Sequence, residues 1–199
     1  GGDNWNPFFT WQATELRSVH FVEPQRGWAV GKSNSMLSTE DGGATWRGVG
    51  NFEGGVNAVH FIDAQRGWAM DSAGAAFTTQ DGGNNWTPLK SNRATAFSSL
   101  HFIDAMRGWA IQGNVILTTN DGGANWIAKS RGSQLSSIYF ADRNHGWAVG
   151  VDPPILRTMD GGRSWTPARN IGPKEYYLYA VHFTDPVNGW AVGRDGVVL

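Results

Sequence analysis

The chain has 199 residues and a formal charge of −1, and it contains no cysteine. A nearly neutral chain has no overall attraction to nucleic acid, and without cysteine it offers neither disulfides nor thiolate ligands for a metal. No apolar run approaches the roughly twenty residues that a membrane-spanning helix needs, so we expect at most a protein peripheral to a membrane.

From residue 16 onward, one pattern recurs at intervals of about forty residues, which is the spacing of propeller blades. Each copy has an alternating segment of the Val-x-Phe type, then Gly-Trp-Ala, then a Thr-x-Asp-Gly-Gly-x-x-Trp turn. Gly-Trp-Ala occurs five times and the aspartate turn four times. The pattern predicts a single all-β domain over residues 1–199, with repeats at about 16–46, 56–86, 97–126, 135–165 and 178–199 plus 1–7.

Each repeat is expected to form four short strands. In the second repeat they are Val56–Phe61, Gly67–Met70, Ala75–Thr79 and Trp86–Leu89, separated by turn-like residues. Proline at position 88 fits an outermost strand, because an edge residue need not donate a ladder hydrogen bond. The sequence thus predicts a five-bladed β-propeller of four-stranded antiparallel blades.

The two ends of the chain look like halves of one repeat. Gly1–Pro7 reads like Gly82–Pro88, the end of a repeat, and Gly196–Leu199 aligns with Gly74–Phe77. We therefore expect the N-terminal strand to complete the C-terminal blade, which would close the ring and leave no sheet edge open.

The aspartate turn has a structural explanation in its own residues. The aspartate can accept hydrogen bonds from backbone amides of its turn, and the paired glycines supply positive φ. The tryptophan then covers the turn and can bury a large apolar area between blades. Calcium binding is the alternative, but the turn lacks the alternating carboxylates of a calcium loop. The residues given this structural role are Asp41, Trp46, Asp81, Trp86, Asp121, Trp126, Asp160 and Trp165.

These turns resemble Asp-boxes, also called bacterial neuraminidase repeats, which occur in sialidases, sortilin-type receptors and photosystem II assembly factors. Val19–Phe21, Gly27–Gly31 and Leu37–Trp46 are most similar to the repeat of the last group. The resemblance covers essentially the whole chain. It implies a non-catalytic scaffold that docks on a photosystem or photosynthetic reaction centre from the periplasm or thylakoid lumen. The better-known photosystem II members have more blades than the five predicted here.

Histidine recurs at one position of the alternating segment. His20, His60, His101 and His182 occupy it, with Tyr139 in the remaining repeat. A ring of metal ligands is one interpretation. The alternation with apolar residues favours another, in which each histidine packs against the neighbouring blade and makes one hydrogen bond there. We therefore expect no metal and no other cofactor.

Three arginines, Arg26, Arg66 and Arg107, precede their Gly-Trp pairs and could form the carboxylate clamp of a sialidase. They fall on the rim that carries the Asp-boxes, whereas sialidase-like active sites occupy the opposite rim. We expect each arginine to pair locally with the acidic residue three positions earlier.

Glycoside hydrolysis needs two carboxyl groups, or a tyrosine with a glutamate partner, facing one pocket. Glu53, Glu175, Tyr176 and Tyr177 lie in links between blades, but they follow no pattern that assigns an acid and a nucleophile. No serine-hydrolase, zinc-protease or phosphate-loop motif occurs. We therefore expect no enzyme activity.

Strand alternation assigns the loops to two rims. The link rim holds the links between blades and the turns between second and third strands, and the Asp-box rim holds the other loops. The link rim is predicted to be the more basic, and it also carries aromatic residues, which are enriched with arginine at protein interfaces. The predicted partner-binding residues are Arg47, Lys90, Arg93, Lys129, Arg131, Arg169, Lys174, Phe52, Phe97, Tyr176 and Tyr177.

The sequence favours a binding propeller whose partners are protein subunits of a membrane complex, with no nucleic-acid partner, in an extracytoplasmic and membrane-peripheral location. Two alternatives remain open. One is a sugar-binding or glycosidase-type module, which requires a deep central pocket with converging carboxylates and arginines. The other is an extracytoplasmic binding domain of a larger receptor.

Overall fold

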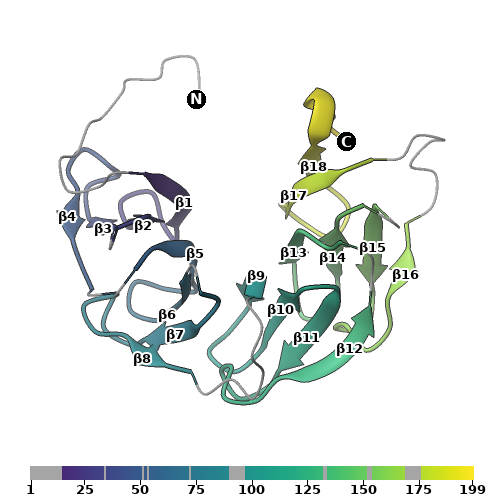
Figure 1. Ribbon diagram of the computed structural model, residues 1–199, viewed down its shortest axis with the longest axis horizontal. Helices are drawn as coiled ribbons and strands as arrows, with labels where there is room; N and C mark the ends of the chain where they lie inside the picture. The colour runs from purple at the N-terminus through teal and green to yellow at the C-terminus, as the bar shows by residue number, and fades with distance from the viewer. Residues whose placement is uncertain are drawn as a thin grey trace.

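A computed structural model describes residues 15–33, 35–50, 52, 54–71, 73–89, 97–131, 134–151, 154–168 and 176–199, without the side chain of Arg131. The sheets are antiparallel and follow one another along the chain as propeller blades (Figure 1). Blade 1 consists of β1 (Leu16–Phe21), β2 (Gly27–Gly31), β3 (Met36–Thr39) and β4 (Arg47–Gly48). Blade 2 consists of β5 (Val56–Phe61), β6 (Gly67–Asp71), β7 (Ala76–Thr79) and β8 (Thr87–Pro88).

The remaining described strands form two further complete blades and part of another. Blade 3 consists of β9 (Phe97–Phe102), β10 (Gly108–Gln112), β11 (Val115–Thr119) and β12 (Ile127–Arg131). Blade 4 consists of β13 (Ser137–Phe140), β14 (Gly146–Val149), β15 (Ile155–Thr158) and β16 (Thr166–Pro167). Blade 5 consists of β17 (Leu178–Phe183) and β18 (Gly189–Gly193), and it is followed by the 3-10 helix η1 (Arg194–Gly196).

Blades 1 to 4 confirm the prediction of an all-β propeller with four-stranded antiparallel blades. The prediction of five complete blades in a closed ring is not confirmed. In the described residues blade 5 is a two-stranded sheet, and the blades form an open arc with β1 at one end and β17 and β18 at the other (Figure 1). The segment 1–7, which was expected to complete blade 5, lies outside the described residues.

The last residues of the chain begin the third strand of blade 5. Val192 pairs with Val198 in an isolated bridge, and Ala191 and Leu199 exchange two backbone hydrogen bonds of 3.0 and 2.9 Å. In blade 2 the same register pairs Met70 with Ala76. Residues 197–199 therefore occupy the start of the third-strand position, as the alignment with residues 75–77 predicted.

Every blade has two chemically different faces. We call the side that carries the Gly-Trp tryptophan the front face, and the side that carries the first-strand Val and Phe the back face. At each junction the front of one blade packs on the back of the next. The Trp28 and Phe61 rings stack with centroids 3.4 Å apart at 2°, and Trp28 Nε1 donates to the carbonyl oxygen of Gly82 at 2.9 Å.

The same junction recurs along the arc. The further stacked pairs are Trp68–Phe102, Trp109–Phe140 and Trp147–Phe183, with centroids 3.8, 3.5 and 3.5 Å apart. Nε1 of Trp68 and of Trp109 also donates to an Asp-box carbonyl of the next blade, at Gly122 and Gly161, over 3.0 Å in each case. Because each junction repeats one stacking geometry, the curvature of the arc is set locally, blade by blade.

The hydrophobic core is divided among these junctions. Between blades 1 and 2, Trp28 and Val30 from the front face pack on Val59 and Phe61 from the back face. Corresponding clusters lie between blades 2 and 3, 3 and 4, and 4 and 5. The fully buried tryptophan of the first junction is thus the Gly-Trp residue, whereas the Asp-box tryptophan Trp86 is half-buried and meets the edge of Phe61 at 5.9 Å.

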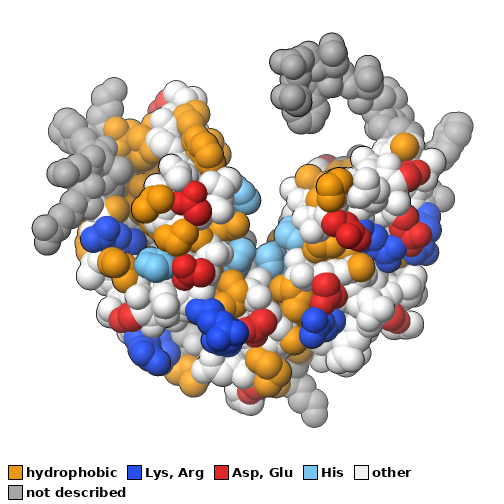
Figure 2. All heavy atoms as spheres, turned by 180° about the vertical axis from the view of Figure 1, so that it is seen from behind, with side chains coloured by type: hydrophobic (Ala, Val, Ile, Leu, Met, Phe, Trp, Pro, Cys, Tyr) orange, Lys and Arg blue, Asp and Glu red, His pale blue; other side chains and the backbone are white. Residues whose placement is uncertain are grey.

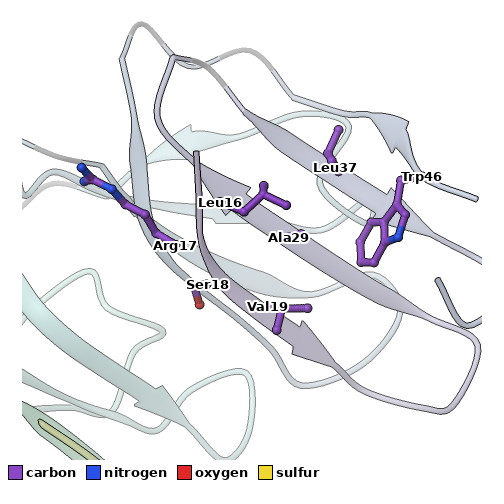
Figure 3. Close-up of a pocket in the computed structure, with 7 residues that line it drawn as sticks. All are labelled: Leu16, Arg17, Ser18, Val19, Ala29, Leu37 and Trp46. Atoms are coloured by element: carbon purple, nitrogen blue, oxygen red, sulfur yellow. The ribbon is translucent and has the colours of Figure 1, made fainter. Parts of the chain in front are cut away.

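Within the described residues, no further blade packs on the apolar faces at the two ends of the arc. On the back of blade 1, Leu16, Val19, Ala29, Leu37 and Trp46 contribute to an open hollow of about 330 Å³ (Figure 3). Figure 2, which views the arc from behind, shows histidines gathered near its middle and acidic and basic side chains interspersed around them.

Candidate functional site: a protein-binding surface

The Asp-box turn is organised by its threonine as much as by its aspartate. Thr39 Oγ1 donates to Asp41 Oδ1 at 2.8 Å and accepts the amide of Gly43 at 2.8 Å. Asp41 in turn accepts the amide of Thr45 at 2.8 Å, while Gly42 and Gly43 adopt φ of 75° and 92°. Hydrogen bonds from the hydroxyl and amide of Thr45, with that from Thr39, lower the pKa of Asp41 to about 2.

The aspartates of the other three Asp-boxes have the same bonds, and each accepts both a threonine hydroxyl and a backbone amide. The four aspartates thus accept hydrogen bonds within their own turns, and the threonine is the part that sequence reasoning missed. The carboxylates are occupied within their own turns. In the part of the chain that the structure describes, no group of three or more His, Asp or Glu residues could hold a metal ion.

On the Asp-box rim, the loop between first and second strands is also closed by an aspartate. Asp104 Oδ1 accepts the amides of Met106 and Arg107, and Asp104 Oδ2 pairs with the Arg107 guanidinium at 2.8 Å. Burial alone would raise the pKa of Asp104, but these hydrogen bonds and the arginine charge together lower it. Arg66 pairs with Asp63 in the same way, at 2.7 Å. The local pairing predicted for these two arginines is confirmed.

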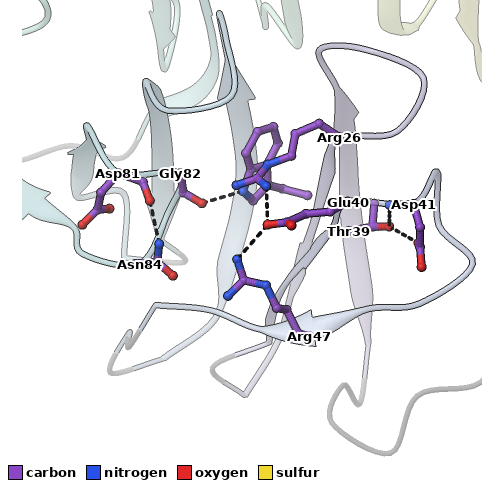
Figure 4. Close-up of polar contacts among 9 residues, drawn as sticks. Arg26, Thr39, Glu40, Asp41, Arg47, Asp81, Gly82 and Asn84 are labelled. Atoms are coloured by element: carbon purple, nitrogen blue, oxygen red, sulfur yellow. Dashed lines mark hydrogen bonds and ion pairs between the residues drawn. The ribbon is translucent and has the colours of Figure 1, made fainter.

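Arg26 departs from that prediction. Its guanidinium bonds to Glu40 in its own Asp-box, not to Glu23, and lies 5.5 Å from the centre of the Trp28 ring. Arg47 reaches the same Glu40 oxygen at 3.2 Å from the other side (Figure 4). The pairing with Glu23 was wrong because the Asp-box turn brings a glutamate within reach across the sheet. The three arginines are held separately and do not form one carboxylate clamp.

His20 and His60 confirm the packing role predicted for the histidines. His20 Nε2 donates to the carbonyl oxygen of Phe61 at 2.8 Å, and His60 Nε2 to that of Phe102 at 2.7 Å; a carbonyl only accepts, so Nε2 carries the proton. The rings form a row, with His60 centred 4.7 Å from His20 and 4.6 Å from His101. Burial lowers the pKa of His20 and lowers that of His60 to about 3, helped at His60 by the neighbouring histidine.

The predicted partner-binding residues fall into three groups in the structure. Phe52 and Phe97 are only 4% and 5% exposed, so their prediction as contact residues was wrong. Both rings lie in the junctions, where Phe52 packs against Phe77 and Trp86, and Phe97 against Trp126. Burying an aromatic ring there removes a large apolar area from water.

A second group keeps exposed side chains. Lys129 is exposed on β12, the outermost strand of blade 3, and Tyr177 is 38% exposed before β17. The Arg194 guanidinium lies 5.5 Å from the centre of the Tyr177 ring. The structure therefore brings an arginine and an aromatic ring together on the link rim. Arg47, by contrast, directs its charge to the Asp-box, and Tyr176 is half-buried against the blade 4–5 cluster.

The third group has no described side chains. Lys90, Arg93, Arg169 and Lys174 lie outside the described residues, as does the side chain of Arg131. Two described basic residues of the link rim have acidic neighbours, because Lys32 pairs with Glu15 at 2.7 Å and Arg194 lies 3.8 Å from Asp195. The basic character of this rim therefore stays a prediction that depends on Lys90, Arg93, Arg169 and Lys174.

A hollow of about 430 Å³ lies between the inner ends of blades 2, 3 and 4. It is lined in part by His60, His101, Asp104, Asp142 and Arg143. Both carboxyl groups have lowered pKa values, although burial opposes the shift, because amides and the side chains of Arg107 and His145 bond to them. A glycosidase acid needs a raised pKa, the opposite of the direction at these two carboxyl groups.

Repeated Asp-box turns on antiparallel blades define the class of protein, an Asp-box β-propeller. Residues 127–199 match the family model described as photosynthesis system II assembly factor YCF48. The chain resembles this family of binding propellers, and no curated protein matches it. Within the described residues, no helix has the length and apolar character needed to cross a bilayer.

Solved structures share the fold. YCF48 from Cyanidioschyzon merolae has a TM-score of 0.77 at 22% identity, over 100% of this chain and 73% of that chain. A structure of YCF48 bound to a D1 peptide has a TM-score of 0.57 at 16% identity, over 98% and 96%. An ancestral GH74 enzyme has a TM-score of 0.74 at 14% identity, over 97% of this chain but 29% of its own. At these identities the likeness shows the propeller fold alone.

Proposed function

We propose that the chain is a non-catalytic binding propeller that docks on a protein subunit of a photosynthetic membrane complex and helps that complex to assemble or persist. The observation that carries this proposal is the match of residues 127–199 to the photosystem II assembly factor family. A structural relative that binds a D1 peptide supports it, because it shows the same fold used to hold a photosystem protein segment.

The chemistry of the described residues agrees with binding rather than catalysis. The aspartates of the Asp-boxes and of the rim loops have their pKa values lowered by local hydrogen bonds, as at Asp41 and Asp160, which lie at about 2. Such carboxylates stay ionised and committed to their turns. We place the protein at the extracytoplasmic side of a membrane, in the periplasm or thylakoid lumen, as a peripheral and non-spanning component.

We propose the link rim as the contact surface, centred in the described residues on Tyr177, Arg194 and Lys129. The Tyr177 ring gives a partner a rigid apolar contact, and the guanidinium of Arg194 beside it gives several hydrogen-bond donors. Lys129, on the outermost strand of blade 3, adds electrostatic attraction, which mainly speeds association. Lys90, Arg93, Arg169 and Lys174 are proposed members of the same surface.

Affinity isolation tests the function. The immobilised protein is mixed with detergent-solubilised photosynthetic membranes and, separately, with a synthetic D1 peptide. Recovery of reaction-centre subunits, identified by mass spectrometry, is the expected result. Failure to retain either the subunits or the peptide would overturn the proposed function.

Charge reversal tests the surface separately. The double variant Lys129→Glu and Arg194→Glu should weaken binding by about tenfold or more, which corresponds to about 1.4 kcal/mol. Arg163→Glu is the matched control, because Arg163 is exposed in the Asp-box turn of blade 4 on the other rim. Equal affinities of the double variant and the wild type would reject the link rim as the contact surface while leaving the function standing.

The glycosidase-type alternative has only fold-level support from the GH74 structure. It predicts turnover of a glycoside by the isolated protein, and measurable hydrolysis would overturn the non-catalytic assignment.

A further inference from the structure

The outermost strand of blade 3 differs from the outermost strands of the other complete blades. β12 spans five residues, whereas β4, β8 and β16 each span two. It lies at the outer margin of the arc, and within the described residues it pairs only with β11 (Figure 1). A longer edge strand offers more backbone to an additional strand, because its outward amide and carbonyl groups have no neighbour there.

The repeat shows which backbone groups of β12 face outward. In blade 2 the amide of Leu89 donates inward to the carbonyl oxygen of Ala76 at 2.8 Å. Opposed residues in an antiparallel pair are hydrogen-bonded and non-bonded in alternation, so Pro88, one residue earlier, has its nitrogen at the free edge. Ala128 holds the same register position as Pro88 against the third strand of its blade. The N–H and C=O groups of Ala128 therefore face outward.

Proline removes the outward donor from two of the other blades. Pro88 in blade 2 and Pro167 in blade 4 stand at the Ala128 position, and proline has no amide hydrogen. Blade 1 has Gly48 there, but β4 ends at that residue. Among the four blades whose outer strands are described, only blade 3 thus combines an outward amide with a strand that continues beyond it.

The residue before Ala128 also differs from its counterparts. Ile127 is apolar and β-branched, yet it is 55% exposed. The residues at this position in the other outer strands are polar, namely Arg47, Thr87 and Thr166. A β-branched side chain on a strand packs well against a cross-strand neighbour. An exposed isoleucine beside an outward amide therefore favours contact with an added strand.

Lys129 determines which chains can pair with this edge. It is exposed, and it forms a β-bulge because the register shifts between Ile116 and Leu117. A lysine and a bulge in an edge strand discourage indiscriminate pairing. Lys129 forms no ion pair within the described residues. Since opposite charges on neighbouring strands attract, this edge favours a segment that brings an acidic residue.

We propose that β12 receives a short extended segment of the protein partner as a fifth strand of blade 3. The backbone of the segment bonds to the N–H and C=O of Ala128, while an acidic residue lies beside Lys129 and an apolar residue beside Ile127. Backbone bonds supply affinity and side chains supply selectivity in such strand addition. The identity of the partner rests on the proposed function. The bulge keeps the segment short, so it forms one part of a larger interface.

A second copy of the chain is a poorer occupant of this edge. β12 reads Ile-Ala-Lys-Ser-Arg and contains no acidic residue. Two copies paired through β12 would bring their lysines and arginines to one short edge without a carboxylate from either strand. Such like charges on neighbouring strands are destabilising.

The repeat supplies a variant that removes only the outward amide. Ala128→Pro introduces the residue that blades 2 and 4 carry at this position, so the ladder to β11 is kept. Gly48→Pro is the matched control, because it makes a proline at the same position of blade 1. Each immobilised protein is titrated with detergent-solubilised photosynthetic membranes, and the retained subunits are quantified by mass spectrometry. Ala128→Pro should raise the half-saturating concentration about tenfold or more, and Gly48→Pro should leave it unchanged.

A measurement on the wild type covers the case in which Ala128→Pro does not fold. Amide hydrogen exchange at Ala128 is followed by nuclear magnetic resonance with a large excess of acetyl-Thr-Val-Glu-Val-Thr-amide. The matched probe has lysine in place of glutamate. The glutamate peptide should slow exchange at Ala128 about tenfold or more, and the lysine peptide should slow it much less. Lys129→Glu should reverse this preference.

Equal half-saturating concentrations for the wild type and a folded Ala128→Pro variant would overturn the added strand and leave the proposed function standing. Exchange at Ala128 that the glutamate peptide does not slow, or that both peptides slow equally, would also overturn the proposal. Self-association of the wild type that Ala128→Pro abolishes would identify a second copy as the occupant and overturn it too. If the wild type retains no subunit, the proposed function fails, and the exchange result alone decides whether β12 accepts an acidic strand.

Discussion

Acid should weaken the junctions between the first three blades through their neutral histidines. His60 is enclosed between His20 and His101 and donates its Nε2 proton to Phe102, and burial holds its pKa at about 3 instead of 6.5. A histidine whose pKa is lowered by folding contributes stability that is complete above about pH 6.5. That stability is lost as the pH falls from 6.5 toward 3.

The magnitude follows from the pKa difference. At pH 5 the pH lies about 1.5 units below the pKa of an unfolded histidine, which is therefore mostly protonated, whereas folded His60 is still neutral. The free energy of unfolding is therefore about 2 kcal/mol lower than at neutral pH. Burial also lowers the pKa of His20 and His101, which adds to the loss. The Asp-box carboxylates do not contribute in this range, because a pKa of about 2 at Asp41 and Asp160 affects stability only below about pH 4.

Urea unfolding at pH 7.5 and pH 5.0, followed by far-ultraviolet circular dichroism, measures this loss. His60→Gln is the comparison, because the glutamine amide can donate to a carbonyl and does not titrate. The wild type should lose about 2 kcal/mol more between the two pH values than the variant does. Equal losses in the two proteins would refute the assignment of the acid sensitivity to His60.

Three further tests by urea unfolding probe the junctions and turns. Trp28→Ala should lower the free energy of unfolding by about 3–5 kcal/mol, and Trp190→Ala by less than about 0.5 kcal/mol, because only the Trp28 ring is buried at a junction. Similar losses in the two variants would contradict the role of the junction. Gly162→Ala should lower the free energy of unfolding by about 1–3 kcal/mol more than Gly113→Ala does. Both glycines have positive φ, but only a Cβ at position 162 would lie 2.8 Å from the indole nitrogen of Trp109. Thr79→Val should lower the free energy of unfolding by about 1–3 kcal/mol, because it leaves the buried amide of Gly83 without its acceptor. An unchanged free energy of unfolding would contradict the role of the threonine in the Asp-box turn.

The repeat made much of the blade architecture predictable. Alternation in Val56–Phe61 and the Gly-Gly turn after Asp81 fix local strands and a local hairpin, and both depend on residues close together in sequence. The histidine contacts were also predictable, because a polar residue at a buried repeat position needs a partner on the next blade. Their common position in each repeat was the signal.

Contacts between repeats were harder to foresee. Trp28 donates to a carbonyl 54 residues away, and nothing in Gly-Trp-Ala distinguishes a tryptophan that stacks across blades from one that covers a turn. Phe52 and Phe97 were placed on the surface because they lie in or beside links, yet apolar burial draws them inward. The size of Phe52 and Phe97 was the available signal, because large aromatic rings are usually buried when an apolar junction between sheets is within reach.

The curvature of the arc that the described residues form was not predictable from the repeat either. The number of repeats gives the number of blades, but the angle between neighbouring blades depends on how closely the rings of Trp28 and Phe61 approach. That distance is a property of packing, which a count of motifs does not contain.

Each junction joins the front face of one blade to the back face of the blade that the ribosome makes next. The indoles of Trp28 and Trp68 each find their carbonyl partner 54 residues later in the chain. At about 5–20 residues per second, a ribosome delivers that partner about 3–11 seconds after the tryptophan. The front face of each newly synthesised blade therefore stays exposed to water until the next blade has been made. Junctions form in chain order from the N-terminus, and the blade made last is the one with an exposed apolar face that a chaperone can bind.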